Sequence, residues 1–226
     1  LAPNGWVVRV AQKVIHQLTT RTLSGALYEV DTRLRPSGRA GLLVSSLAGF
    51  ERYQQADAWT WEHQALVRAR PVAGPEALAR DFEAVREAVL RRPRDRATLR
   101  DEVDRMRERM LASAGPEEAG RFRLKADRGA VVDIEFMVQY LVLGWAEQHP
   151  ELTRFRDNLR ILETAADAGL LPAASADRIA DAYRRLRAEQ HRRLLHDDDA
   201  GAAVEAEPWQ DLREEVGGLY RRLLAG

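Results

Sequence analysis

The chain has 226 residues, 45% of them hydrophobic, which is enough for one large domain or two small ones with a real core. Its 35 basic and 35 acidic residues cancel to a formal net charge of zero, which argues against a general binder of nucleic acids or membrane surfaces. Cysteines, a membrane-spanning apolar run and a signal peptide are all absent from the sequence, so disulfide and thiolate chemistry are excluded and a cytoplasmic protein without a membrane partner is expected.

The first 46 residues predict a helix followed by a β-hairpin. Apolar side chains recur at helical spacing from Trp6 to Thr22. Leu27 to Arg35 alternates with period two, and Leu42 to Ser46 has the character of a returning strand after the turn-rich segment PSGRAG. One hairpin is too little sheet to be stable alone, so we expect it to pack on the rest of the chain or to pair with strands outside it.

The remainder of the chain has helical patterns almost to its end. The connections are short, as between antiparallel neighbours in a bundle, and the segment HDDDAGAAVEAEP is predicted to be a mobile loop. The sequence therefore predicts a mainly α protein, with a mixed segment at 1–46 and a helical bundle at 47–226. The helices are expected at Ala48–Ala58, Thr60–Arg70, Pro75–Arg91, Asp95–Ala112, Val131–Glu147, Arg156–Ala168, Pro172–Leu195 and Trp209–Leu224.

Charged residues gather on one face of the first predicted strand. Glu29, Asp31, Arg33 and Arg35 lie two apart, so their side chains point the same way at intervals of about 7 Å. Phosphoryl and nucleotidyl transfer need carboxylates for Mg²⁺ and cations for phosphate oxygens, and this spacing suits both. The alternative is an exposed edge strand with surface ion pairs, which periodicity alone favours.

A second charged cluster lies in KADRGAVVDIEF. Lys125, Asp127, Asp133 and Glu135 suggest a carboxylate cluster at the edge of a cleft. Alternatively, Asp127 caps the following helix, and Asp133 and Glu135 interact favourably with the positive end of its dipole. Lysine is rare in this chain, which makes Lys125 mildly notable.

The segment WTWEHQALVRAR carries a third candidate set. Its two tryptophans suit core or interface anchors, and Arg68 and Arg70 either reach a phosphate or pair with local carboxylates. The five histidines lack metal-site spacing, and the acidic run Asp197–Asp199 lies in a Gly- and Ala-rich segment typical of a solvated loop.

Longer strings resemble one family. LYEVDTRLRPSGRAGLLVSSLAGFERYQQADAWTWEHQALVRARPVAG, LKADRGAVVDIEFMVQYLVL and LTRFRDNLRILETAADAGLL are similar, in this order, to glutamine synthetase adenylyltransferase, the bifunctional adenylylating and adenylyl-removing enzyme of bacteria. The resemblance covers nearly the whole chain. VDTRLRPSG followed by WTWEHQALVRAR resembles the C-terminal, adenylyl-transferring half of that enzyme.

The resemblance implies a polymerase-β-like nucleotidyltransferase unit followed by a helical bundle. It implies transfer of AMP from ATP to a tyrosine hydroxyl of glutamine synthetase, with a PII signal protein as a further partner of the full-length enzyme. In the family, Mg²⁺ ions lie on three carboxylates, and the matching position here is Asp31, a catalytic residue and metal ligand. Arg33, Arg35 and Lys125 are then candidates for the triphosphate, and Glu29 for orienting Arg33 or the surroundings of the metal.

The chain departs from the family in one respect, since the G-S-D-x-D strand that supplies two of those carboxylates is absent. The chain is therefore expected to be a fragment and, by itself, inactive. Two alternatives remain open. One is the adenylyl-removing half, whose reaction is phosphorolysis, and the other is a non-catalytic docking module for glutamine synthetase or a PII protein.

Overall fold

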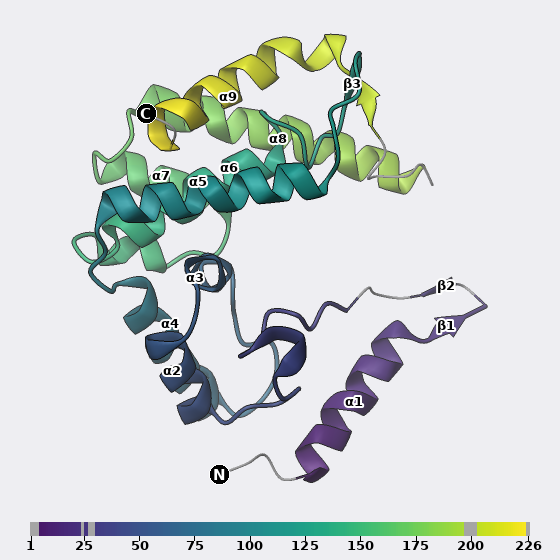
Figure 1. The fold of residues 1–226 in the computed structure, drawn as a ribbon, viewed down its shortest axis with the longest axis vertical. Helices are drawn as coiled ribbons and strands as arrows, with labels where there is room; N and C mark the ends of the chain where they lie inside the picture. The colour runs from purple at the N-terminus through teal and green to yellow at the C-terminus, as the bar shows by residue number, and fades with distance from the viewer. Residues whose placement is uncertain (1–4, 24, 27–29, 197–202, 225–226) are drawn as a thin grey trace. The chain divides into compact units, whose positions relative to one another are not determined.

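The computed structural model describes residues 5–23, 25–26, 30–196 and 203–224, and it is mainly α, as predicted (Figure 1). No helix in these ranges is long and apolar enough to cross a membrane. The helices are α1 (Gly5–Thr19), α2 (Leu47–Ala56), α3 (Thr60–Leu66), α4 (Glu76–Leu90), α5 (Arg96–Ser113), α6 (Val131–Trp145), α7 (Asn158–Asp167), α8 (Ala173–Leu195) and α9 (Gln210–Leu224), with 3₁₀ turns at Gly38–Ala40, Pro150–Thr153 and Glu207–Trp209. The strands are β1 (Arg21–Thr22), β2 (Gly25–Ala26), β3 (Arg121–Phe122) and β4 (Val204–Glu205).

Contacts within the chain divide it into two compact units. The first comprises residues 1–65 and 71–89, and the second comprises residues 66–70 and 90–226. The division falls inside α3 and at the end of α4. Compact units need not coincide with the domains of a family, so the predicted boundary after residue 46 stays a prediction.

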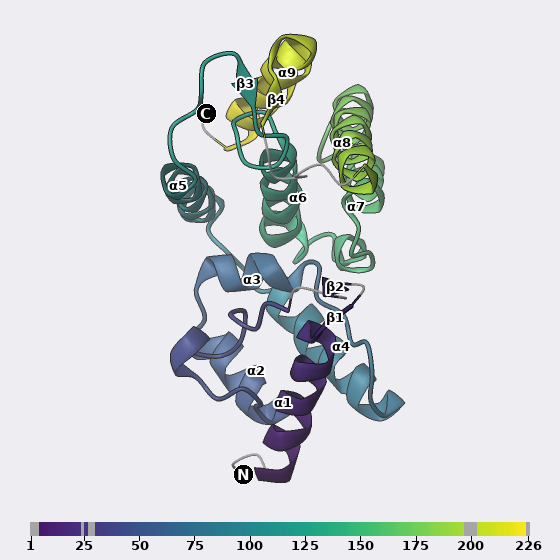
Figure 2. The ribbon, with the colours of Figure 1, turned by 90° about the vertical axis from the view of Figure 1, so that its right-hand side faces the viewer.

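The second unit is built around α6. This helix contacts α5, α7, α8 and α9, and Figure 2 shows it between α5 and the α7–α8 pair. Ile134, Met137 and Leu141 recur at helical spacing and are almost completely buried. Apolar side chains on nearly every face of α6 explain its central place, because a helix that is apolar all round is stable only when it is enclosed.

Strands β3 and β4 join segments that lie far apart in the sequence. Phe122 pairs with Val204, and the backbone N–H of Ala206 donates to the carbonyl of Gly120. Phe122 is fully buried. The predicted mobile loop is thus wrong for its last part, where pairing with β3 fixes residues 204–205, while Asp197–Asp199 lie outside the described residues.

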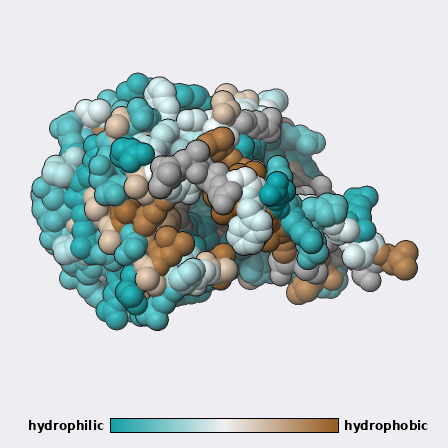
Figure 3. All heavy atoms as spheres, turned by 90° about the horizontal axis from the view of Figure 1, so that it is seen from below, coloured by the Kyte–Doolittle hydropathy of each residue, from teal (hydrophilic) through white to brown (hydrophobic). Residues whose placement is uncertain are grey.

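The first unit begins with α1, which confirms the predicted helix. The helix ends at Thr19, whose hydroxyl donates to the carbonyl of Ile15. No side chain of α1 is buried, and its apolar residues Trp6, Val10 and Val14 are 63%, 41% and 52% exposed. Figure 3 shows apolar side chains at the surface in several places on the face that it draws.

The predicted hairpin differs in position. A hairpin does follow α1, but it is formed by β1 and β2, with Arg21 opposite Ala26 and Thr22 opposite Gly25. The expected strands at 27–35 and 42–46 are wrong where they can be assessed, because residues 30–46 contain no strand, and residues 27–29 lie outside the described ranges. Hydrogen bonds from side chains to nearby backbone groups hold residues 30–46 in a loop. This conformation competes with the hydrogen bonds that would pair the residues in a β-sheet.

A buried ion pair ties α5 to the start of α6. The Arg107 guanidinium, 1% exposed, donates to the Asp133 carboxylate at 2.5 Å and to the carbonyls of Ala126 and Asp127. Asp133 also accepts the backbone N–H of Gly129 at 2.6 Å. The pair therefore pins the segment that leads into α6 as well as the two helices.

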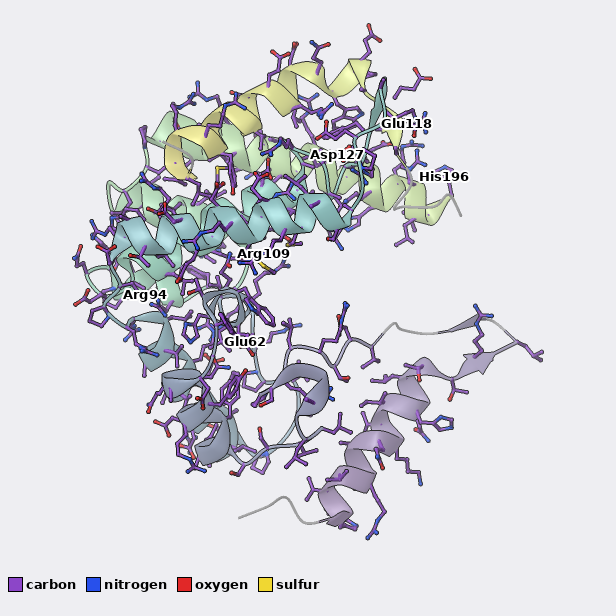
Figure 4. All side chains as sticks on the ribbon, viewed as in Figure 1. Glu62, Arg94, Arg109, Glu118, Asp127 and His196 are labelled. Carbon is purple, nitrogen blue, oxygen red and sulfur yellow. The ribbon has the colours of Figure 1, made fainter. Side chains whose placement is uncertain are left out.

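We predict that Arg107→Met lowers the free energy of unfolding by about 3–5 kcal/mol, because it leaves the buried Asp133 carboxylate without its cation. Denaturant titration measures this difference. Arg109→Met is the matched control on the same helix, since Arg109 is exposed (labelled in Figure 4), and it should change stability by no more than about 0.5 kcal/mol. Equal effects of the two substitutions would contradict the assignment of this pair.

Candidate active site

Asp31 and Arg33, near the start of residues 30–46, form an ion pair that several hydrogen bonds hold together. The Asp31 carboxylate accepts the backbone N–H of Arg33 at 2.8 Å, and it accepts Nε and Nη2 of the same guanidinium at 2.9 and 2.6 Å. The two side chains are 52% and 65% exposed. The hydrogen bonds and charge of Asp31 raise the pKa of Arg33. The sequence placed these residues on one face, and the structure brings them into direct contact.

Arg35 points into the loop that follows. Its Nη1 donates to the carbonyl and hydroxyl of Thr32 at 2.5 and 3.0 Å, and its Nε donates to the carbonyl of Gly41 at 3.4 Å. The guanidinium therefore bridges the two ends of a loop from Thr32 to Gly41, which we call the RPSG loop. Arg35 is half-buried, in contrast to the exposed Arg33.

The tip of the RPSG loop is a tight turn with left-handed backbone. Ser37 and Gly38 have φ of 60° and 54°, and the N–H of Gly38 donates to the carbonyl of Arg35 at 2.8 Å. Gly41 lies so close to Pro36 that a β-carbon at this position would be 1.8 Å from the Pro36 carbonyl oxygen. A side chain at position 41 is incompatible with this closed loop.

A buried carboxylate joins α3 to α2 in the first unit. The Tyr53 hydroxyl on α2 contacts both carboxylate oxygens of Glu62 on α3 at 3.0 Å, and Glu62 also accepts the backbone N–H of Trp59 at 3.0 Å. Glu62, labelled in Figure 4, is only 6% exposed. Desolvation and this carboxylate raise the pKa of Tyr53, which keeps the hydroxyl protonated.

The sequence did not identify this contact. Glu62 was noted only as part of WTWEHQALVRAR, without a role of its own. One local signal was available, because Glu62 lies three residues after Trp59, where a carboxylate can bond to the first free N–H of a helix. Its second contact, to Tyr53, depends on the packing of α2 against α3.

The second predicted cluster is internal to the second unit. Asp127 is buried and accepts the backbone N–H and Nε of Arg123 at 2.7 and 2.6 Å, so the prediction that it caps α6 is wrong. Asp133 pairs with Arg107, as described above. Lys125 is exposed and belongs to the second unit, whereas Asp31 belongs to the first.

Partners of the remaining candidate residues are identified only in part. Arg68 donates to Glu135 at 2.6 Å, so it pairs with a carboxylate, but with one that lies 67 residues along the chain and not with a local one as predicted. Arg70 is exposed, and Glu29 lies outside the described residues. The predicted roles of Glu29 and of Lys125 therefore stay predictions.

The chemistry of Asp31 suits one ligand of a magnesium ion. Mg²⁺ prefers oxygen ligands and commonly takes one or two carboxylates together with water and substrate phosphates, and Asp31 is an accessible carboxylate. Across the residues that the structure describes, no group of three or more acidic or histidine side chains could hold a metal. Asp31 therefore suits one ligand position, and the described residues contain no acidic cluster around it.

Two segments of the chain match known protein families. The profile of the family described as glutamate-ammonia ligase adenylyltransferase matches residues 1–85, and that of GlnD PII-uridylyltransferase matches residues 97–217. Both names are those of nucleotidyltransferases. The two matches meet close to the boundary between the compact units, at the end of α4.

Curated relatives are similar to the chain over nearly its full length. Proteins named bifunctional glutamine synthetase adenylyltransferase/adenylyl-removing enzyme are 51% identical in Thioalkalivibrio sulfidiphilus, over 96% of this chain, and 52% identical in Hahella chejuensis, over all of it. The relative in Pseudomonas aeruginosa is 50% identical over 96% of the chain. The chain belongs to the glutamine synthetase adenylyltransferase family, and it spans 22–24% of the length of these relatives.

We predict that Gly41→Ala opens the RPSG loop, because the added methyl group overlaps the Pro36 carbonyl oxygen. The substitution should cost roughly 1–3 kcal/mol of unfolding free energy, measured by denaturant titration. Gly5→Ala is the control, since a β-carbon there meets nothing within 4 Å. If both variants were as stable as the parent protein, the closed form of the loop would be refuted.

Proposed function

We propose that this chain is part of the adenylyl-transferring half of a bifunctional enzyme that moves AMP from ATP to a tyrosine hydroxyl of glutamine synthetase. The observation that carries the proposal is the accessible Asp31–Arg33 pair at the base of a closed loop, in a chain about half identical to enzymes of that name. The wording TWEHQALVRAR supports the transferring half over the removing half.

The ion pair suits a magnesium–triphosphate ligand because the two groups have opposite charge. A nucleotide with its metal brings an anion for Arg33 and a cation for Asp31, so each side chain exchanges its present partner for a new one of the same sign. A guanidinium fits two phosphate oxygens at once, which also orients the chain of phosphates. Mg²⁺, when bound, supplies neutralisation of the triphosphate charge.

The proposed reaction is a displacement at the α-phosphorus of ATP. The tyrosine oxygen of glutamine synthetase forms a bond to that phosphorus and loses its proton, while the bond to the bridging oxygen breaks and pyrophosphate leaves. In this scheme Arg33 binds and orients the triphosphate. Arg35 contributes by closing the RPSG loop beside it.

Two other functions have specific support. The adenylyl-removing half is the alternative within the same enzyme, because the relatives' name covers both activities. A docking role is the second, supported by the match of residues 97–217 to the PII-uridylyltransferase profile. In that case the second unit would contact a PII-type protein or glutamine synthetase without taking part in the chemistry.

In the full-length enzyme, Asp31→Asn should reduce Mg²⁺-dependent adenylyl transfer on the order of a hundredfold or more, since a lost metal ligand costs several kcal/mol of charge stabilisation. Incorporation of labelled AMP into glutamine synthetase measures it. Asp177→Asn, on an exposed aspartate of α8, is the control and should keep normal activity. Near-normal transfer by the Asp31 variant would remove this residue from the site.

The 226-residue chain alone should show no measurable transfer of AMP from ATP. Its described residues offer one carboxylate for the metal and no acidic cluster, so the charge on the triphosphate stays insufficiently neutralised. The same labelled-AMP assay applies, with the full-length enzyme as the positive control. Robust turnover by the chain alone would show that Asp31 needs no further carboxylates.

A further inference from the structure

We infer that the second unit carries a binding site for a phosphate group, in a pocket between α9 and the segment that leads into α6. The pocket has a volume of about 310 Å³, which is enough for a small ligand. Arg128 from that segment and Arg213 and Arg221 from α9 line it, so three guanidiniums border one space. The inference stands apart from the proposed function, because Asp31 and Arg33 belong to the first unit.

Two of the arginines are held in place by partners outside the pocket. Arg213 donates through Nη2 to Glu117 at 2.8 Å and through Nε to the Arg128 carbonyl at 3.3 Å. Its guanidinium also lies 4.6 Å from the centre of the Phe122 ring. Arg128 donates through Nη2 to both carboxylate oxygens of Glu108, at 2.8 and 2.7 Å. Neither glutamate lines the pocket, and among the described residues Nη1 of each arginine has no hydrogen-bond partner, so both arginines are already oriented and can still donate to a ligand.

Arg221 supplies a positive charge that no described residue neutralises. It is exposed, and it makes no hydrogen bond or ion pair with a residue that the structure describes. The pocket wall also contains Glu214, which accepts from Nε2 of Gln210 at 3.1 Å. Glu214 precedes Arg221 by two helical turns, roughly 10 Å along the axis of α9, so the two charges mark opposite ends of this wall.

A phosphate group has the chemistry that this wall requires. It brings negative charge for Arg221 and several acceptor oxygens for the remaining N–H groups of Arg128 and Arg213, and a guanidinium can bind two such oxygens at once. Glu214 repels a phosphate but accepts hydrogen bonds from hydroxyl groups, so the hydroxyls of a sugar phosphate suit that end of the pocket. Two sources of the phosphate group are therefore compared in the test, inorganic phosphate and a small sugar phosphate.

A glycine on α9 leaves room beneath Arg221. Gly217 lines the pocket in the middle of the helix, where glycine is an unfavourable residue. A β-carbon at this position would lie 3.5 Å from Nη1 of Arg221, so the guanidinium extends back over the helix at Gly217. Gly218 has the same relation to Arg222, also at 3.5 Å, but neither of these two residues lines the pocket. The two adjacent pairs therefore provide matched controls.

The test measures binding to the 226-residue chain by isothermal titration calorimetry, with inorganic phosphate and with ribose 5-phosphate, in buffer containing EDTA. We expect Arg221→Gln to lower the affinity roughly tenfold, because it removes a charge-assisted hydrogen bond. Arg222→Gln removes the same charge one residue further on and should change the affinity by no more than about twofold, since exposed charges outside the pocket are screened. Arg33→Gln should bind like the parent, which excludes binding at the Asp31–Arg33 pair.

Alanine substitutions at the two glycines separate binding from stability. Gly217→Ala and Gly218→Ala should both raise the thermal midpoint of unfolding, because alanine is the better helix former. Only Gly217→Ala should weaken phosphate binding, since its methyl group enters the pocket beside Arg221. A variant that is more stable and yet binds less well cannot have lost its ligand through unfolding.

The inference is overturned if the parent chain binds neither phosphate compound, or if Arg33→Gln abolishes the binding. Equal losses in Arg221→Gln and Arg222→Gln would also overturn it, because they would indicate general attraction to a basic helix end. Tighter binding of ribose 5-phosphate than of inorganic phosphate supports the inference and identifies an organic phosphate as the ligand. Equal binding of both, lost in Arg221→Gln alone, supports it with the phosphate ion itself as the ligand.

Discussion

The buried carboxylate of Glu62 is the constraint that joins α2 to α3 in the unit that carries the candidate site. A charged group that is withdrawn from water must be compensated by hydrogen bonds, and Glu62 obtains them from the Trp59 N–H and the Tyr53 hydroxyl. These bonds fix α3 relative to α2, in the same compact unit as the exposed Asp31–Arg33 pair.

Arginine residues have different roles in the candidate site and in the second unit. Arg33 is exposed and paired, so it is available to exchange its partner, whereas Arg35 is committed to the carbonyl groups of its own loop. In the second unit, Arg107 and Arg123 neutralise buried aspartates beside α6. The same residue type therefore serves both recognition and internal architecture, and only its environment distinguishes the two.

Much of the fold followed from periodicity, because an apolar stripe at helical spacing is a local property of the sequence. The helices of the bundle lie close to where apolar spacing placed them, except that α3 ends at Leu66 and not at Arg70. The RPSG loop was predicted less well, since its conformation depends on side-chain bonds to backbone that alternation in the sequence does not reveal. Pairing of β3 with β4 depends on contact between segments far apart in the chain.

The candidate site was predictable in part. The types and spacing of Asp31 and Arg33 identified a cation and an anion suited to phosphate chemistry, and the two side chains are in fact in contact. The sequence could not separate Arg33 from Arg35, because only the folded loop shows that Arg35 bonds to Thr32 and Gly41 while Arg33 stays exposed. Asp127 and Asp133 resembled a site until their arginine partners, Arg123 and Arg107, were known.

The central claim is that the Asp31–Arg33 pair serves adenylyl transfer and not adenylyl removal. The most direct test measures both reactions side by side in the full-length enzyme carrying Arg33→Gln, using unmodified and adenylylated glutamine synthetase as substrates. The account predicts that transfer from ATP falls sharply while phosphate-dependent removal continues at the parent rate. Loss of removal with transfer unchanged would contradict it and assign the pair to the opposite half of the enzyme.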